Sequence, residues 1–364
     1  MAGESPNPSP QSPRVAIVAV NWNGWRDTLE CLESVRGLDY PDYLMIVVDN
    51  GSQDDSRARI AEWARRREGY RLVEYPKTVA RAGGEAAQEE VLAQALPADR
   101  MVLIASAVNS GPTGGGNLGI EYALRRRQPA EYVFLLDNDA KTERRTLTYL
   151  VELDQKENAG IMGGAIMDRE TGELQYAERT TLLRWFFNPL VKADLPVRGD
   201  EDDCWPSAGV SGGVMLIRRE VLDALYAATG RYLAAELFMD GWEFELCYRS
   251  GLAGFRSFVT RKGFVWHKGE RFARRALSTK RYYYTTRNRM LLAGDFLPLH
   301  WRVIFHPYNL ALGFVRMLKA LKTGRPDVAR AIICGIMDGY KGVTGKWAQH
   351  NDREGVQETL NPSV

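Results

Sequence analysis

The sequence predicts an α/β protein in which helices flank a mostly parallel sheet, and three observations support this prediction. Short runs of aliphatic and β-branched residues, without polar alternation, indicate strands buried on both faces. Turn-forming residues and then a stretch with apolar residues at helical spacing follow most of these runs. The length of 364 residues, 45% of them hydrophobic, suffices for one large domain or two modest ones.

Most of the predicted elements lie in the first half of the chain. The first strand leads into the turn-forming segment Asn21-Trp22-Asn23-Gly24 and then into a helix. We expect a glycine-rich loop over Asn109–Gly119, followed by a helix to about Arg127. Residues 77–100 interrupt the alternation, and we expect an excursion with one exposed helix there. Strands are predicted at residues 15–20, 44–48, 70–75, 101–105, 132–136 and 160–167, and helices at 26–36, 56–67 and 146–155.

The second half of the chain has a different character. A strand is expected at Ser211–Ile217 and a helix at Arg219–Ala227. Residues 261–290 carry ten Lys and Arg against one acid, Glu270. Residues 291–346 mix large apolar with basic residues, which predicts amphipathic helices with a basic and apolar surface. The apolar positions in question are Trp301, Ile304, Phe305, Tyr308, Leu312, Val315 and Leu318, and the basic ones Arg302, Arg316, Lys319 and Lys322.

Composition and charge argue against several classes of protein. A formal net charge of +2 argues against a general nucleic-acid-binding protein. The N-terminal segment is rich in Pro and Ser and lacks the apolar core of a signal peptide. No uninterrupted apolar run reaches the roughly 18 residues of a membrane span, and four cysteines without metal-ligand spacing indicate incidental thiols in a reducing compartment. We therefore expect a cytoplasmic protein that contacts a membrane only peripherally.

Polar side chains follow three of the predicted strands where they end. Asn21 and Asn23 follow the first strand, Asp49-Asn50 ends the second, and Asp137-Asn138-Asp139 follows the strand at 132–136. Because ligands of open parallel sheets bind beyond the carboxyl ends of the strands, we expect these groups to line one cleft.

Asp137 and Asp139 form the strongest local signal. Two carboxylates one residue apart at a strand end can hold a hard divalent cation, Mg²⁺ or Mn²⁺, with positions left for phosphate oxygens. The alternative is a solvated turn that caps the next helix, and Asp49-Asn50 has the same alternative. The segment Gly114-Gly115-Gly116-Asn117 matches neither a Walker A loop nor a dinucleotide fingerprint, and is either a close backbone approach to a ligand or a flexible connector.

Six segments follow one another within about residues 14–290. They are VAIVAVNWNG, MIVVDNGSQDDS, NSGPTGGGNLGIEYAL, YVFLLDNDA, SGGVMLIRREVL and LFMDGWEFELCYRSG. Each segment alone is common, but the ordered series resembles glycosyltransferase family 2, most closely the rhamnosyltransferase-type branch that builds bacterial surface polysaccharides. The resemblance implies a GT-A fold and an inverting transfer from a nucleotide-diphosphate sugar.

The resemblance also implies a role for each polar cluster. Asp49 resembles the aspartate that reads the nucleotide base, and Asn21 and Asn23 lie where the family contacts base and ribose. Asp137 and Asp139 match the DxD motif of metal ligands, with Asp139 as the direct ligand. The nucleotide-sugar-binding residues implied in this way are Asn21, Asn23, Asp49, Asn109, Gly114, Gly115, Gly116, Asn117, Asp137 and Asn138.

The segment LFMDGWEFELCYR departs from the family pattern. Glu243 falls where the family has its catalytic aspartate, but Trp242-Glu243 stands where paired acids are usual, so Asp240 is a rival for the general base. If both acids lie on a helix, they share one face. His267 matches a family histidine that holds metal or diphosphate, although a lone histidine is as often structural.

With the resemblance, the chain divides into four parts. We expect a disordered tail at residues 1–13, a GT-A catalytic domain at 14–290 with a helical insertion at 77–100, a helical region at 291–346 and a flexible tail at 347–364. The basic segment and the aromatic and apolar residues that follow it fit an anionic membrane surface, and core packing explains the same aromatics equally well.

The implied donor is a nucleotide-diphosphate sugar, with UDP or dTDP favoured over GDP, and the implied acceptor is a glycan or a lipid-linked sugar. Nucleic acid is not an expected partner. A sugar nucleotidyltransferase is a rival, but it calls for an early glycine-rich loop with Arg and Lys, where this chain has Asn21-Trp22-Asn23-Gly24. The other rival is a catalytically degenerate scaffold or sugar-binding subunit, which Trp242-Glu243 favours and the intact DxD opposes.

Overall fold

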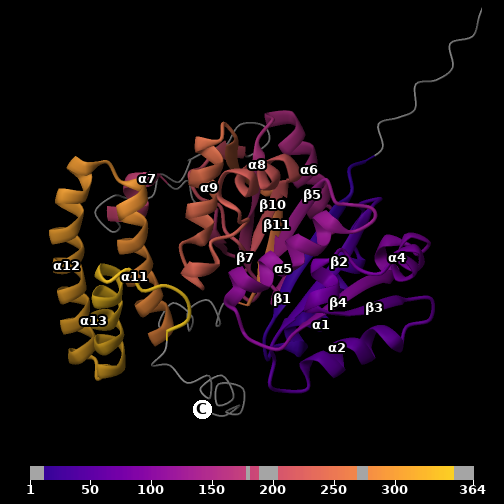
Figure 1. Ribbon diagram of the computed structural model, residues 1–364, viewed down its shortest axis with the longest axis horizontal. Coiled ribbons are helices and arrows are strands. Elements are labelled where there is room, and N and C mark those ends of the chain that lie inside the picture. The colour runs from indigo at the N-terminus through magenta and orange to yellow at the C-terminus, as the bar shows by residue number, and fades with distance from the viewer. Residues whose placement is uncertain (1–11, 178–180, 188–203, 269–277, 348–364) are drawn as a thin grey trace, which may run out of the picture.

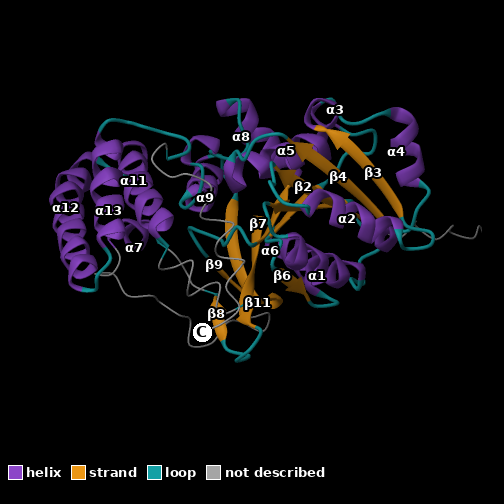
Figure 2. Ribbon diagram, turned by 90° about the horizontal axis from the view of Figure 1, so that it is seen from below, coloured by secondary structure: helices purple, strands orange, loops and turns teal. Residues whose placement is uncertain are grey.

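The computed structural model describes residues 12–177, 181–187, 204–268 and 278–347 (Figure 1). In these residues, helices cover a central sheet, and a group of C-terminal helices stands beside it (Figures 1 and 2). The predicted α/β class, with a mostly parallel sheet and C-terminal helices, is confirmed.

The strands in the described part of the chain form one 11-stranded sheet. They are β1 Val15–Asn21, β2 Tyr43–Asn50, β3 Arg71–Pro76, β4 Arg100–Ser106, β5 Tyr132–Leu136, β6 Ala140–Thr142, β7 Gly160–Asp168, β8 Leu174–Tyr176, β9 Cys204–Pro206, β10 Val214–Arg218 and β11 Arg256–His267. The order is β3-β4-β2-β1-β5-β10-β7-β11-β6, with β8 on β7 and β9 on β11. Along this order β10 and β6 run against the other strands, so the carboxyl ends of β1, β2, β4 and β5 meet at one edge.

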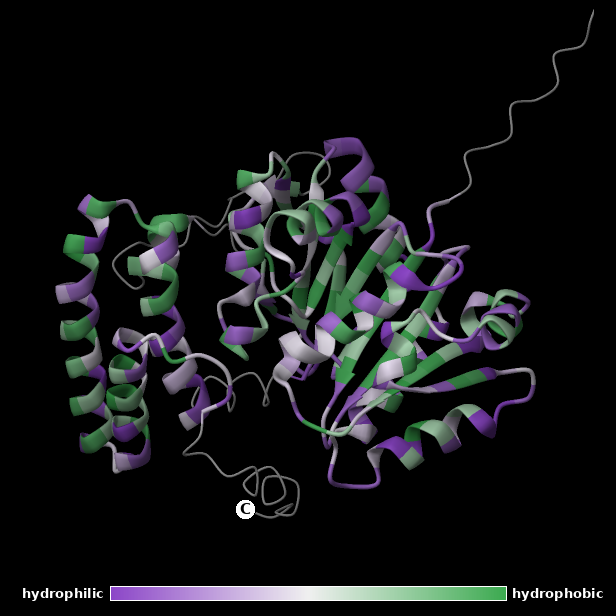
Figure 3. Ribbon diagram, in the orientation of Figure 1, coloured by the Kyte–Doolittle hydropathy of each residue, from purple (hydrophilic) through white to green (hydrophobic). Residues whose placement is uncertain are grey.

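Successive residues of the central strands pack into opposite helical layers. Ile17 joins the core beneath α1 Trp25–Arg36, α2 Ser56–Arg65 and α6 Thr146–Glu157, whereas Val18 joins the core on the other face. The central strands are accordingly mostly hydrophobic, while many residues of the helices that flank the sheet are polar (Figure 3). The second layer consists of α3 Lys77–Arg81, α4 Ala86–Ala93, α5 Gly111–Arg125, α8 Arg219–Thr229 and α9 Trp242–Leu252.

The insertion at residues 77–100 contains two helices where we expected one, and most residues of the second helix are exposed, as we expected. It forms α3, α4 and a short 3₁₀ turn, and Ala80 and Leu92 are fully buried. Glu89 of α4 is also buried and forms an ion pair of 2.9 Å with Arg126. It accepts further hydrogen bonds from the hydroxyls of two tyrosines, Tyr75 and Tyr122.

The predicted glycine-rich loop is a helix from Gly111 onwards. Gly115 lies against β1, where an added Cβ would come within 2.6 Å of Val20, and Gly119 lies equally close to Val18. Helix α5 therefore approaches the sheet more closely than a helix with side chains at these positions could. The glycines are explained by this packing, which outweighs their low helix propensity of about 1 kcal/mol each.

The C-terminal helices are α11 Thr279–Phe296, α12 Leu299–Lys322 and α13 Pro326–Tyr340. Helix α11 runs through residue 290, so no break in secondary structure marks the expected domain boundary. Some of the apolar residues predicted for this region are buried and others are exposed. Phe305 is buried, with its ring 5.5 Å from that of Phe186 in α7 Leu182–Phe187. Ile304, Val315 and Leu318 are exposed.

Among the described residues, no helix is both long and apolar enough to span a bilayer. The expected tails lie almost entirely outside the described residues, and residues 269–277 of the basic segment do so as well.

We predict that Glu89→Ala destabilises the fold by about 3–5 kcal/mol, because it leaves the Arg126 guanidinium and two tyrosine hydroxyls buried without their acceptor. Denaturant unfolding measures the loss. The matched control is the neighbouring Glu90→Ala, which removes an exposed ion pair with Arg127 and should change stability by less than about 1 kcal/mol. Equal effects of the two substitutions would show that the buried pair does not anchor α4.

Candidate active site at the carboxyl ends of the strands

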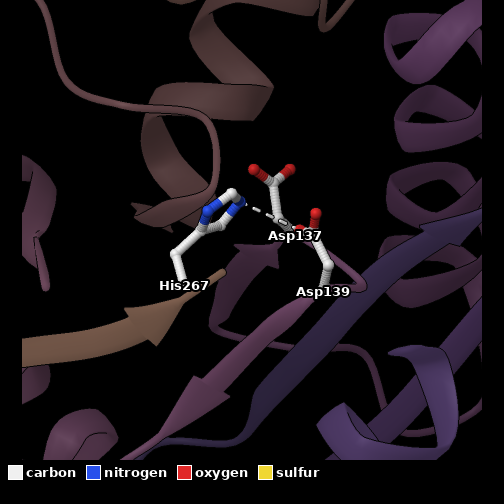
Figure 4. A group of neighbouring side chains, drawn as sticks. All are labelled: Asp137, Asp139 and His267. Atoms are coloured by element: carbon white, nitrogen blue, oxygen red, sulfur yellow. Dashed lines mark ion pairs between the residues drawn. The ribbon is translucent and has the colours of Figure 1, made fainter. Parts of the chain in front are cut away.

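Two carboxylates and an imidazole meet at the ends of β5 and β11 (Figure 4). Asp137 follows the last residue of β5, and Asp139 leads into β6, where Ala140 pairs with His267 at the end of β11. The Nε2 atom of His267 lies 3.1 Å from Oδ1 of Asp139. One ligand atom from each of the three residues falls within 4.8 Å of the others, so the cluster fits a single metal ion.

A tight turn at Gly212-Gly213 lies directly against this cluster. The expected strand at Ser211–Ile217 starts only at Val214, because the two glycines form a turn before it. The amide of Asp137 donates to the carbonyl of Gly213 at 3.1 Å, and a Cβ on Gly213 would lie 2.5 Å from Oδ2 of Asp137. On the other side, Gly212 contacts Trp242 and comes close to Glu243. The turn thus brings the DxD carboxylates and the start of α9 together.

The residues expected to bind the base form a hydrogen-bonded row across β1 and β2. Asn21 donates to Oδ1 of Asp49 at 2.9 Å, and Ser52 donates to the same oxygen at 2.5 Å. Thr28 of α1 donates to Asn21 and accepts from Asn138. The row links Asp49 to Asn138 of the DxD motif through Asn21 and Thr28, and it fixes the orientation of the Asp49 side chain.

The other predicted amides hold loops in place. Asn109 accepts from Asn50, and Asn50 also bonds to Ser110 and to the carbonyl of Gly111, which has a positive φ of 77°. Asn117 bonds to both backbone groups of Leu233, and its interactions are therefore structural.

Asn23 has the same kind of role, because its side chain accepts from the amide of Gln53 while its own amide donates to Ser52.

Asp240 lies in a strained loop before α9, so the expectation that Asp240 and Glu243 share a helical face is wrong. Phe238 and Asp240 have positive φ values of 64° and 57°, which non-glycine residues rarely adopt. Asn288 of α11 lies 2.6–3.1 Å from the carbonyls of residues 237, 239 and 240, and the buried Arg287 also donates to the first of them. Helix α11 therefore holds the loop in its strained conformation.

Glu243 and Glu245 have different surroundings although both lie in the first turn of α9. Glu245 is buried and pairs with Arg231 and Arg249, so it stabilises the fold. Glu243 is half-buried and lies beside Gly212. Asp240 is paired with Arg281 at 3.9 Å. Glu243 is thus the acid of this segment nearest to the glycine turn.

A cavity of about 250 Å³ opens between these elements. Of the predicted site residues, Asn109, Gly116 and the segment Asp137–Asp139 line it. The expectation that all of them line one cleft is not met, because the following residues are not part of the wall: Asn21, Asn23, Asp49, Gly114, Gly115, Asn117, Asp240, Glu243 and His267. The remaining wall includes residues that sequence analysis did not assign to the site, because nothing local marks them: they come from the segment after β1, the loop before α9 and the start of that helix, helix α11 and the segment after α13. They are Trp22, Phe238, Trp242, Lys280, Tyr284, Lys346 and Trp347.

The two thiols nearest the site are poor nucleophiles. Burial raises the pKa of Cys247 to about 12 and shifts the pKa of Cys31, which lies beneath Asp137 and Asp139, well above its ordinary value. Both therefore stay protonated at neutral pH, in agreement with the interpretation of the cysteines as incidental.

Comparison with known proteins matches residues 15–96 and 87–226 to the family described as glycosyl transferase family 2. The chain belongs to glycosyl transferase family 2. A curated relative, the low-salt glycan biosynthesis hexosyltransferase Agl10 of Haloferax volcanii, is 24% identical over 250 residues, which cover 68% of this chain and 78% of that protein.

A solved structure with a similar fold is the mannosyltransferase PcManGT of Pyrobaculum calidifontis in complex with GDP-Man and Mn²⁺. It has a TM-score of 0.53 and 16% identity, and the likeness covers 92% of this family 2 chain and 91% of the mannosyltransferase. The expected GT-A fold and the assignment as a nucleotide-sugar glycosyltransferase are thus confirmed. The rhamnosyltransferase branch stays a prediction.

At the cluster of Asp137, Asp139 and His267, we predict that Gly213→Ala weakens Mn²⁺ binding about 10- to 100-fold, because the new Cβ displaces the Asp137 carboxylate. Titration of the metal-free protein with Mn²⁺, followed by electron paramagnetic resonance, measures the affinity. Gly251→Ala is the matched control, since Gly251 of α9 has open space around its Cα and a side chain costs nothing there. An unchanged affinity in Gly213→Ala would show that Asp137 is not a ligand.

Proposed function

We propose that the protein is an inverting, metal-dependent hexosyltransferase. It moves a sugar from a nucleotide-diphosphate sugar to a hydroxyl of a glycan or a lipid-linked acceptor. The observation that carries the proposal is the Gly212-Gly213 turn, which has the DxD carboxylate on one side and Glu243 on the other. Sugar transfer needs positive charge at the leaving diphosphate and a base at the attacking hydroxyl. The turn separates the carboxylate that would hold the cation from the carboxylate that would act as the base, and keeps both close to it.

The donor set of the cluster fits a divalent cation. Carboxylates from Asp137 and Asp139 suit Mg²⁺ and Mn²⁺ equally, and the imidazole of His267 favours Mn²⁺. When bound there, the cation neutralises charge that builds on the diphosphate as the anomeric bond breaks. Lys280 and Lys346 line the same cavity and add positive charge. The structurally similar mannosyltransferase contains Mn²⁺.

The hydrogen bonds to Asp49 favour a pyrimidine nucleotide. The bonds from Asn21 and Ser52 both go to Oδ1, which leaves Oδ2 for the ligand. A single carboxylate oxygen matches the one N–H that uracil and thymine present, whereas guanine offers two adjacent donors that suit both oxygens. UDP- and dTDP-sugars are therefore the preferred donors, in contrast to the GDP-Man of the mannosyltransferase.

Glu243 is the general base of the proposed reaction. It is half-buried at the start of α9 and lies beside the glycine turn, whereas Asp240 lies in the strained loop before the helix. A single displacement, with the base taking the proton of the acceptor hydroxyl as it attacks the anomeric carbon, inverts the configuration there. The mechanism needs no covalent nucleophile, and the buried thiols of Cys31 and Cys247 supply none.

For the metal, we predict that Asp139→Ala abolishes turnover supported by Mg²⁺ or Mn²⁺ while the circular dichroism spectrum is unchanged. Release of nucleoside diphosphate from a sugar nucleotide measures the turnover. Asp223→Ala, an exposed acid on α8, is the control for loss of charge. Full activity of Asp139→Ala, or of the wild type in excess chelator, contradicts metal dependence.

For the base, we predict that Glu243→Gln lowers kcat by about 10²- to 10⁴-fold with little change in nucleotide affinity. The amide keeps the size of the side chain but cannot accept the proton. Glu243→Asp should retain partial activity, because the carboxylate is present but one methylene further from the hydroxyl.

Asp240→Asn is the control for this assignment. An inactive Asp240→Asn together with a normal Glu243→Gln would assign the base to Asp240. If neither substitution affects turnover, neither acid is the general base and the assignment of Glu243 is wrong. If the wild type binds nucleotide without turnover, the protein is a scaffold. Consumption of a nucleoside triphosphate and a sugar phosphate would identify a nucleotidyltransferase.

For the donor, we predict that UDP or dTDP with Mn²⁺ stabilises the protein more than GDP does. Saturation at a hundredfold excess over Kd contributes about 2.7 kcal/mol, and a thermal-shift series over the three nucleotides measures it. Asp49→Asn should reduce the stabilisation by the pyrimidine nucleotides. A larger stabilisation of the wild type by GDP would contradict the proposal that Oδ2 of Asp49 selects a base with a single N–H donor.

A further inference from the structure

Helix α12 exposes a continuous apolar face to solvent. Its buried positions, Phe305, Asn309, Gly313 and Ala320, face the neighbouring helices, and Gly313 lies against Ile336 of α13. The opposite side should be polar in a helix that meets only water. Instead, residues at helical spacing along its whole length are large and apolar, with exposed fractions of 76% for Leu299, 68% for Val303, 52% for Ile304, 42% for Leu310, 56% for Phe314, 60% for Val315, 48% for Leu318 and 50% for Leu321.

This apolar face lies at the outer edge of the molecule. In two views at right angles, α12 is the element of the helical group furthest from the sheet (Figures 1 and 2). Its 24 residues correspond to about 36 Å of helix. An exposed apolar surface of this length is unusual in a protein that meets only water and marks an interaction site.

The charges on α12 are all positive. The helix contains Arg302, Arg316, Lys319 and Lys322 and no acidic residue. Lys319 and Lys322 are exposed near its C-terminal end. The two acids of α13 are engaged elsewhere in the chain, since Asp327 pairs with Arg325 and Asp338 accepts from Tyr283. The surface therefore combines apolar side chains with positive charge.

Two possible occupants of the apolar face of α12, the ends of the chain and a second copy of the chain, fit it poorly. The ends of the chain, residues 1–11 and 348–364, contain Met1, Val356, Leu360 and Val364 as their only large aliphatic residues, too few to cover the face. A second copy of the chain would bring no acidic side chain of α12 to pair with Lys319 and Lys322.

We propose that the exposed face of α12 docks the protein on an anionic lipid surface, with the helix lying in the plane of the interface. The apolar side chains enter the boundary between headgroups and acyl chains, while the lysines meet anionic headgroups. The inference rests on the surface of α12 alone and is independent of the proposed sugar transfer.

Cosedimentation with vesicles of phosphatidylcholine, with and without phosphatidylglycerol, tests the proposal. The full chain should pellet with the anionic vesicles and be released by salt, because the attraction is screened over about 8 Å at physiological ionic strength. The combined substitution Val303→Ser, Phe314→Ser and Leu318→Ser should weaken binding more than about 10-fold. Lys319→Gln with Lys322→Gln should weaken it about 5-fold for each lysine.

Matched controls use exposed residues away from α12. One control removes exposed apolar side chains elsewhere with Leu96→Ser, Leu174→Ser and Leu252→Ser. The other control removes an exposed lysine with Lys156→Gln. Neither control should affect vesicle binding. Since all substituted side chains are exposed, an unchanged melting temperature is expected throughout. Absence of pelleting, pelleting that ignores the α12 substitutions, or light scattering that shows a dimer dissociated by the α12 triple substitution would overturn the proposal.

Discussion

The contact between the Asp137 carboxylate and the backbone of Gly213 is the constraint on which the rest of the site depends. No Cβ fits between them, so the turn before β10 has to be glycine. Its neighbour Gly212 is equally constrained by Trp242. Two adjacent glycines thereby fix the separation between the cluster of Asp137, Asp139 and His267 and the start of α9. A shift of a few tenths of an ångström here would move Asp137 and Glu243, the proposed metal ligand and the proposed base, together.

The C-terminal helices are part of the same construction. Helix α11 contributes Lys280 and Tyr284 to the cavity wall, and its Asn288 and Arg287 hold the strained loop that precedes α9. On its far side α11 packs against α13, which in turn supports α12. Backbone strain of the kind seen at Phe238 and Asp240 persists only where surrounding contacts enforce it. Thus the position of Asp240 is set by residues nearly fifty positions later in the chain.

The sequence was sufficient for β1–β5, β7 and β10 and for the pair Asp137 and Asp139, because these signals are local. It missed β6, β8 and β9, which are three residues long, and β11, whose apolar run is interrupted by polar residues; His267 was assigned only through the family resemblance. Buried strands appear as apolar runs, and the acids at the end of β5 follow such a run directly. Glycines are harder to interpret, since their role depends on what packs against them: Gly115 and Gly119 look like a ligand loop but allow α5 to approach Val20 and Val18. Glu89 resembles any surface glutamate of a polar helix, and only the fold brings Arg126 to it.

The central claim is that one metal ion held by Asp137, Asp139 and His267 lies in the same cleft as a pyrimidine nucleotide bound to Asp49. Crystals of the protein grown with Mn²⁺ and UDP, measured at the manganese absorption edge, test it most directly. We predict one strong anomalous peak among the three ligands, in contact with the diphosphate, and the uracil N3–H directed at Oδ2 of Asp49. Nucleotide density in the cleft without an anomalous peak at this cluster, or a base bound away from Asp49, would contradict it.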